Sequence, residues 1–259
     1  MLMVIVSCDK VIDVHLPAHE PQLILEMYLE EGRPLTCLLT ESLAYTDTAI
    51  IKPVNDALVI FSDGTRNDTL KNSVSRDTSN GRFYNYYSPR VVTADVTKTY
   101  SIRIADKKER NISATTAFLE KTTAIDSVAV RASVNEPDSF SVGVMISDPQ
   151  NIDNYYRFMV GRRFKEFVSE YADFRVNDIS FNGKPFSFFS DAIFKKKDSI
   201  TVRVYSLRKE HYDFLESTRD ARRSNFNPFS QPGRIKSNVS GGLGIFTTIR
   251  FSQKTLVIN

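Results

Sequence analysis

The chain has 259 residues, of which 41% are hydrophobic and 25% charged, the composition of an ordinary globular protein. This length suggests one or two domains that fold without disulfides or metals. The net charge is +3 and the basic residues are dispersed, which argues against a nucleic-acid-binding protein. No apolar run approaches the roughly 20 residues that a membrane-spanning helix needs.

The first eight residues, Met-Leu-Met-Val-Ile-Val-Ser-Cys, are followed at once by polar sequence. The tetrad Ile5-Val6-Ser7-Cys8 has the pattern that a bacterial lipoprotein signal peptidase requires, with a small residue before the cut and a cysteine to acylate. A secretory signal also has a charged segment and about 7–15 apolar residues. We therefore expect residues 1–8 to be a truncated lipoprotein signal, Cys8 to be lipidated and residues 9–21 to be a polar tether. The alternative is a ragged N-terminus with a buried cysteine.

Residues 22–120 predict an N-terminal β-sandwich that is immunoglobulin- or transthyretin-like. Gly32 and Pro34 separate its first two β-rich segments and predict a hairpin. Residues 63–82 are rich in Asn, Asp, Ser and Thr and predict a long hairpin loop. Strands are predicted at 22–29, 35–42, 54–61, 100–105 and 111–118.

Residues 121–259 predict a second β-sandwich, because short strands with turn signals between them are typical of that architecture. The tail, 245–251 and 255–258, is expected to close its sheet. The earlier strands of this domain are predicted at 127–134, 140–147, 155–160, 174–181 and 200–205. The fold class is thus all-β, with two sandwich domains.

A single amphipathic helix is predicted over 207–222, on the second sandwich. Its apolar stripe follows the helical period. Ser206 is the expected N-cap. His211 lies on the stripe, so we expect it to be packed rather than catalytic. The stripe comprises Leu207, His211, Phe214, Leu215 and Thr218.

The cysteines and histidines give no metal site. Cys37 lies in an alternating segment that predicts a buried side chain. A disulfide with Cys8 is the alternative in an oxidising compartment, and it would exclude lipidation. His15 and His19 have the spacing of a helical zinc pair, but Pro17 between them disrupts a helix turn, so a solvated tether is expected.

No catalytic residues or cofactor are predicted. The chain has three His and lacks a Gly-x-Ser-x-Gly elbow, a His-Glu-x-x-His motif and a phosphate loop followed by Lys. With 31 acidic residues, a glycosidase-type pair of carboxylates stays open, although no spacing indicates one.

Two aromatic clusters are candidate contact surfaces. Side chains on a strand alternate, so some rings of each cluster are expected to point outward. Cross-strand aromatic packing is the equally weighted alternative. The candidate residues are Tyr84, Tyr86, Tyr87, Tyr155 and Tyr156.

Gly241, Gly242 and Gly244 precede a strand rather than a helix. A phosphate loop needs a helix N-terminus behind it. The glycines therefore predict a tight turn or bulge where the backbone passes close to another element.

Several motifs join the Cys8 tetrad in a common pattern: His19-Glu-Pro-Gln-Leu-Ile, Ile125-Asp-Ser-Val, Asp153-Asn-Tyr-Tyr-Arg-Phe, Tyr212-Asp-Phe-Leu, Asn227-Pro-Phe-Ser and Ser237-Asn-Val-Ser-Gly-Gly-Leu-Gly-Ile-Phe. Together they resemble one family, the Bacteroidota lipoproteins known as domain of unknown function 4249. The likeness covers nearly the whole chain and is most specific from Tyr212 to Phe246.

The resemblance implies a lipoprotein of the cell envelope with β-sandwich domains, often encoded beside TonB-dependent outer-membrane receptors. We expect a non-enzymatic accessory or ligand-capture subunit, anchored to the outer membrane at Cys8, whose partner is such a receptor barrel. Its ligand, a small molecule, glycan or peptide, is not specified by the sequence. The alternatives are an envelope hydrolase with paired carboxylates and a structural or adhesion lipoprotein.

Overall fold

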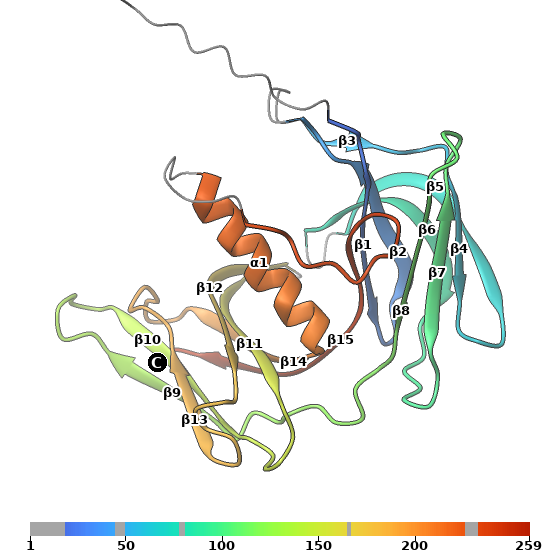
Figure 1. Ribbon diagram of the computed structural model, residues 1–259. Helices are drawn as coiled ribbons and strands as arrows, with labels where there is room; N and C mark the ends of the chain where they lie inside the picture. Colours follow the sequence, from blue (N-terminus) through green and yellow to red (C-terminus); the bar gives the residue numbers. More distant parts are fainter. Residues whose placement is uncertain (1–18, 45–49, 78–80, 165–166, 226–232) are drawn as a thin grey trace, which may run out of the picture.

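The computed structural model describes residues 19–44, 50–77, 81–164, 167–225 and 233–259 (Figure 1). The predicted signal segment with Cys8, most of the tether and His15 lie outside the described residues. The described chain is mostly β-strand with one helix, and its sheets are packed as in a sandwich. The all-β prediction is confirmed. No helix among the described residues is long and apolar enough to cross a membrane.

The elements follow the chain in the order shown in Figure 1. They are β1 (Leu23–Glu30), β2 (Pro34–Glu41), β3 (Lys52–Pro53), β4 (Leu58–Ser62), β5 (Asn67–Arg76), β6 (Phe83–Val91), β7 (Tyr100–Ala105), β8 (Asn111–Thr116), β9 (Ser127–Ala132), β10 (Phe140–Ser147), β11 (Tyr155–Phe164), β12 (Phe167–Asn177), β13 (Pro185–Phe189), β14 (Ser199–Leu207), α1 (Lys209–Asn225) and β15 (Leu243–Val257).

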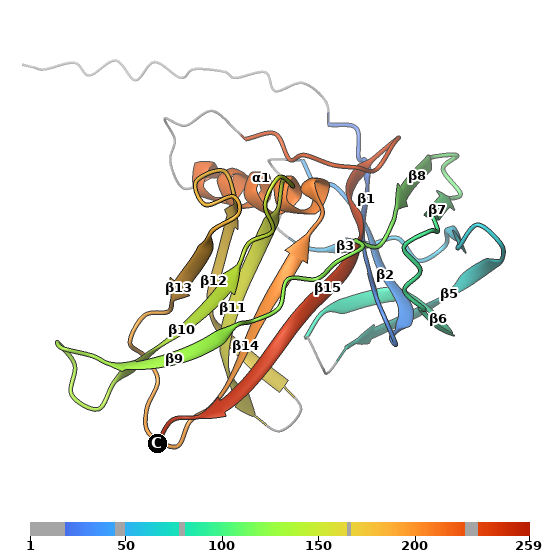
Figure 2. The same ribbon diagram turned by 90° about the horizontal axis from the view of Figure 1, so that it is seen from below.

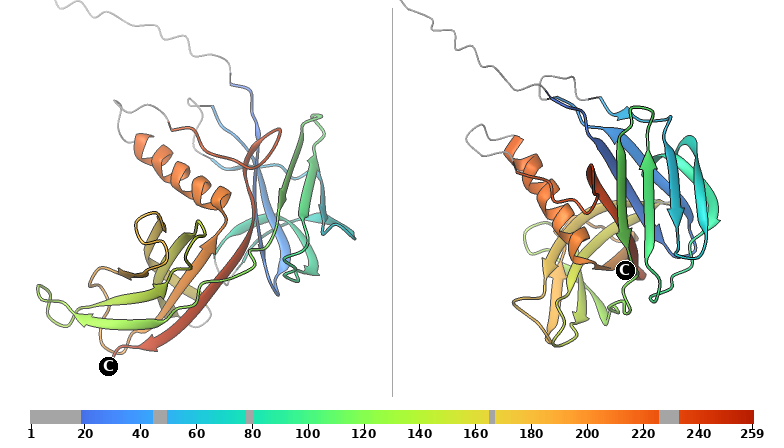
Figure 3. Two further views of the ribbon diagram at one scale, coloured as in Figure 1. Left: turned by 60° about the horizontal axis from the view of Figure 1, so that its bottom comes forward. Right: turned by 45° about the vertical axis from the view of Figure 1, so that its right-hand side comes forward.

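Twelve strands form one continuous sheet, and three form a smaller one. The large sheet has the order β12-β11-β14-β15-β1-β2-β6-β5-β4-β7-β8, with β3 also paired to β2, and the small sheet has the order β13-β10-β9. The N-terminal strands lie on one side of β15, and the C-terminal strands and α1 lie on the other (Figure 3).

The long C-terminal strand β15 joins the two halves of the molecule. Its first half pairs in parallel with β1, from Leu243 to Ile249, and its second half pairs antiparallel with β14 (Figure 2). The tail therefore joins the C-terminal strands as predicted through its second half, and its first half also pairs with the N-terminal strands. Residues 244–249 are all buried, as expected for a central strand covered on both faces.

The N-terminal core is built by alternation. On β1 and β2 every second residue is buried, and the residues between them face the other side of the sheet. Val239 and Phe246, from the C-terminal end of the chain, belong to the same core. The N-terminal core is thus completed by residues more than 100 positions further along the chain.

Half of the predicted loop over 63–82 is a strand. β5 has ten residues and pairs with both β4 and β6. Apart from Leu70, which is buried, and Val74, which is exposed, its side chains are polar or charged, so its sequence lacks the alternation that marks a strand.

The helix α1 begins two residues later than predicted. The carbonyl of Arg208 accepts hydrogen bonds from the amides of His211 and Tyr212. The Ser206 hydroxyl accepts a bond from the amide of Thr123 rather than capping the helix. Tyr212 and Leu215 on α1 pack over Met159 and neighbouring apolar residues of the sheet.

The connection between β8 and β9 is fixed along β15. Alternate polar side chains of this strand donate hydrogen bonds to carbonyls of the connecting segment. These hydrogen bonds hold the segment against β15, in addition to its covalent connection to β8 and β9. The pairs are Thr248 with Ala117, Arg250 with Leu119, Ser252 with Thr123 and Lys254 with Asp126.

Candidate functional site

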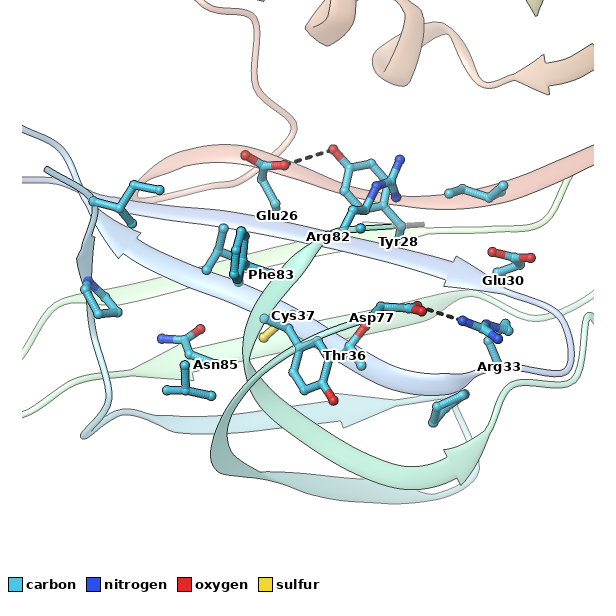
Figure 4. Close-up of a pocket in the computed structure, with 18 residues that line it drawn as sticks. Glu26, Tyr28, Glu30, Arg33, Thr36, Cys37, Asp77, Arg82, Phe83 and Asn85 are labelled. Atoms are coloured by element: carbon cyan, nitrogen blue, oxygen red, sulfur yellow. Dashed lines mark hydrogen bonds and ion pairs between the residues drawn. The ribbon is translucent and has the colours of Figure 1, made fainter. Parts of the chain in front are cut away.

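A pocket of about 420 Å³ lies on the side of β1 and β2 that faces away from the N-terminal core (Figure 4). Its floor carries Glu26, Tyr28 and Glu30 of β1 and Thr36 of β2, the residues that alternate with the buried ones. Ile249 of β15, which pairs with Glu30, also lines it. The volume is within the range of small-molecule sites.

The β5–β6 hairpin covers the floor. Val74, Asp77 and residues 81–85 line the pocket from this hairpin. The β5–β6 register shifts between Asn72 and Ser75, and such irregularities bend and twist a strand pair. The predicted loop thus supplies one wall of the pocket.

Apolar side chains line much of the pocket and remain exposed to solvent. Ile51 is 68% exposed, Val74 66% and Phe83 59%. Pro34, Leu38 and Pro53 add further apolar surface. Exposed apolar side chains gathered around a cavity are typical of a binding surface.

The charged residues are divided between two ends of the pocket (Figure 4). At one end Arg33 donates to Asp77 at 2.7 Å, and Glu30 lies nearby with a pKa that burial raises. At the other end the Tyr28 hydroxyl donates to a carboxylate oxygen of Glu26 at 3.2 Å. The guanidinium carbon of Arg82 lies 4.0 Å from the centre of the Tyr28 ring.

Asn85 stabilises the wall of the pocket where β3 and β6 both pair with β2. β6 pairs with β2 from Pro34 to Cys37, and β3 pairs with β2 at Thr40 and Glu41. Between them the Asn85 side chain accepts from the Leu39 amide and donates to the Leu39 and Val54 carbonyls, at 2.8–2.9 Å. The amide group therefore replaces a missing segment of strand in the backbone ladder.

Tyr28 also connects the pocket to the second half of the molecule. Its ring lies 5.6 Å from the ring of His211 on α1. Burial raises the pKa of the Tyr28 hydroxyl. Burial lowers the pKa of His211 to about 3, with smaller contributions from Arg157 and Arg82.

The five tyrosines predicted to form contact surfaces differ in their burial. Tyr86 is 1% exposed and Tyr156 is fully buried, so their assignment to a contact surface is wrong. The Tyr86 hydroxyl accepts from the amide of Ala57, and the Tyr156 hydroxyl donates to the carboxylate of Asp148.

The other three tyrosines are half-buried. Tyr84 lines the pocket and stacks on Tyr87, with ring centres 6.1 Å apart. Tyr155 packs against Tyr212 of α1, with centres 5.1 Å apart, so its ring supports the helix. Among the predicted residues, Tyr84 is therefore the one that belongs to the pocket.

The three glycines of the predicted turn lie where backbones approach closely. A Cβ atom at Gly241 would lie 2.3 Å from the carbonyl oxygen of Asn111, and one at Gly242 2.6 Å from that of Leu23. At Gly244, which has φ +118°, the distance to the Leu25 oxygen would be 1.9 Å. These glycines allow the chain to pass between β8 and β1.

The remaining chemical candidates give no second site. Cys37 is buried in β2, as predicted, and burial raises the pKa of its thiol. In the part of the chain that the structure describes, no group of three His, Cys, Asp or Glu side chains is arranged to hold a metal ion.

Sequence reasoning missed most of the pocket. The signal that was available is Glu26, Tyr28 and Glu30 at alternating positions of a strand whose other face is wholly apolar. The strand's alternation indicates one buried and one outer face, but not what covers the outer face.

Comparison with protein families matches one family model, described as a domain of unknown function (DUF4249), over residues 9–255. Comparison with curated proteins gives no match. Among solved structures, the chain is similar to one described as "Cytokine receptor complex - Crystal form 1A", at 11% identity, with 73% of this chain and 86% of that chain covered and a TM-score of 0.25. At this TM-score the likeness carries no argument about fold or function.

Proposed function

The chain belongs to the DUF4249 family, as its motifs predicted, and we propose that it is a cell-envelope lipoprotein that captures a small ligand for a TonB-dependent uptake system. The observation that carries the capture role is the 420 Å³ pocket with exposed apolar walls and a few charged groups. The membrane anchor rests on the Ile5-Val6-Ser7-Cys8 pattern.

The carboxylates of the pocket favour binding over hydrolysis. Glu26 and Glu30 lie at opposite ends of the pocket (Figure 4), with the Tyr28 hydroxyl bound to Glu26, so they are not arranged as a pair around one bond. A glycosidase needs two carboxyl groups that flank the scissile bond. The third carboxylate, Asp77, is held by Arg33. The pocket therefore supports a non-enzymatic role better than one that uses paired carboxylates.

The membrane part of the proposal is tested by a pull-down. The tagged protein, expressed from its native locus, is extracted from native membranes in mild detergent, and its partners are identified by mass spectrometry. We expect a TonB-dependent barrel with the wild type and loss of membrane association in Cys8→Ala. A wild type that is recovered alone would contradict the accessory role.

The capture part is tested on the same samples by native mass spectrometry. Thr36→Trp fills the floor of the pocket, whereas Thr40→Trp places the same ring on the same face of β2 outside it. We expect a co-purifying small molecule with the wild type and with Thr40→Trp, and its loss with Thr36→Trp. A bound molecule that persists in Thr36→Trp would contradict capture by this pocket.

A further inference from the structure

The charges of the pocket specify a chemical class of ligand. At the end formed by Arg33, Asp77 and Glu30, positive and negative groups compensate each other. Arg33 and Asp77 form an ion pair at 2.7 Å, which leaves Glu30, Glu26 and Arg82. The guanidinium of Arg82 lies over the Tyr28 ring, between Glu26 and Glu30 (Figure 4), and attracts Glu30, so two carboxylates share one cation and the pocket keeps one excess negative charge. The end at Glu30 has little net charge to offer a ligand.

Glu26 is the carboxylate at the other end. Its hydrogen bond from Tyr28 uses one of about four lone-pair positions on the two carboxylate oxygens. The Phe83 ring lies near Glu26 (Figure 4), and Ile51 and Pro53 add apolar surface to the pocket. A carboxylate beside apolar surface favours a positively charged hydrogen-bond donor and disfavours an anion.

The shape and lining add a second requirement. The cavity extends along the floor from Glu26 towards Glu30, past the rings of Tyr28 and Phe83 (Figure 4), and Tyr84 also lines it. An apolar body in this space would remove the exposed Val74 and Phe83 side chains from water.

We propose that the pocket binds a small amphipathic amine, with its ammonium group on the carboxylate of Glu26 and its apolar body between the sheet and the β5–β6 hairpin. This assignment rests on the proposed capture function and names the class of its ligand. Two groups then share the Glu26 carboxylate, because the Tyr28 hydroxyl orients it and the ammonium binds its remaining lone pairs.

The test compares three probes with one apolar chain and different head groups. Octylamine, octanol and octanoate are titrated into the purified protein at pH 7 by isothermal calorimetry. We expect octylamine to bind at least about tenfold more tightly than octanol, a difference of about 1.4 kcal/mol or more, since its ammonium donates charge-assisted hydrogen bonds to Glu26. Octanoate is expected to bind most weakly.

Two variants assign the preference to one residue. In Glu26→Gln the affinity for octylamine falls to that for octanol, while octanol binding is unchanged. Glu120→Gln removes the same charge at an exposed position outside the pocket and keeps the wild-type preference. Thermal unfolding of both variants checks that they are folded.

Other results overturn the assignment without deciding the capture role. If octanol or octanoate binds as tightly as octylamine, the pocket captures a different class of ligand and the amine proposal is wrong. If none of the probes binds, the amine proposal is also wrong, and the comparison of Thr36→Trp with Thr40→Trp still decides whether the pocket holds a natural ligand.

Discussion

His211 makes the stability of the protein depend on pH. The side chain is 2% exposed, and within the described structure neither ring nitrogen has a hydrogen-bond partner. It lies against the Tyr28 ring, with Arg157 and Arg82 as the nearby charges. A proton on this ring would place an uncompensated charge among apolar and cationic neighbours, which is costly.

The size of the effect follows from the two pKa values. The pKa of His211 is about 3 in the folded protein, against about 6.5 in the unfolded chain. Between these values the unfolded chain binds more protons, so the free energy of unfolding falls as the pH falls below 6.5. The loss is about 2 kcal/mol from pH 7 to pH 5, and it approaches about 5 kcal/mol below pH 3.

His211→Leu tests this reasoning. Urea unfolding followed by circular dichroism at pH 7 and pH 5 gives the free energy of unfolding of the wild type and the variant. We expect the variant to be within about 1 kcal/mol of the wild type at pH 7, because an apolar group replaces unpaired polar atoms. It should lose about 2 kcal/mol less than the wild type on going to pH 5.

The control is His19→Leu, which removes an exposed histidine before β1. This variant is expected to keep the pH dependence of the wild type. If His211→Leu and the wild type lose equal stability between pH 7 and pH 5, the buried, neutral His211 is not the cause and the reasoning is refuted.

Two further predictions concern backbone contacts and use the same urea assay. Asn85→Leu removes the partner of the Leu39 amide and of the Val54 carbonyl, while the Leu39 carbonyl keeps the hydrogen bond from the Val54 amide. The free energy of unfolding should therefore fall by about 3 kcal/mol; a change below about 1 kcal/mol would contradict the bridging role. Gly244→Ala forces a Cβ against the Leu25 oxygen and should cost more than about 3 kcal/mol. Gly32→Ala, with φ +77° and open space around it, should cost only about 1 kcal/mol; equal costs would argue against the close approach.

The sequence alone was sufficient to predict those strands and the helix in which apolar residues recur with the period of the element. Alternation in residues 23–30 and 34–41 predicted β1 and β2 because one face of each is buried. The stripe through His211 predicted α1 for the same reason, and the helix packs on the sheet with that stripe. In each of these elements, the spacing of the apolar residues indicates which face is buried in a core.

The pocket was not predictable in this way, since its walls come from separate segments. Eight of the ten residues of β5 are polar or charged, so its sequence resembled a loop. In β6, Asn85 and Tyr86 are adjacent and both are buried. The strand therefore lacks the strict alternation from which outward-pointing tyrosine rings were predicted. Tyr84 and Tyr86 would share a face on a regular strand, yet only Tyr86 is in the core.

The pairing of β15 with both β1 and β14 was not predictable from the sequence either, because it joins segments that lie far apart along the chain. Nothing within residues 243–257 marks the point where β15 leaves β1 and begins to pair with β14. That change brings α1 beside β1, and His211 then contacts Tyr28, whose hydroxyl holds Glu26. The orientation of the carboxylate in the pocket therefore depends on a helix almost 200 residues away in sequence, and a change in either half that separates the two rings would alter the binding end of the pocket.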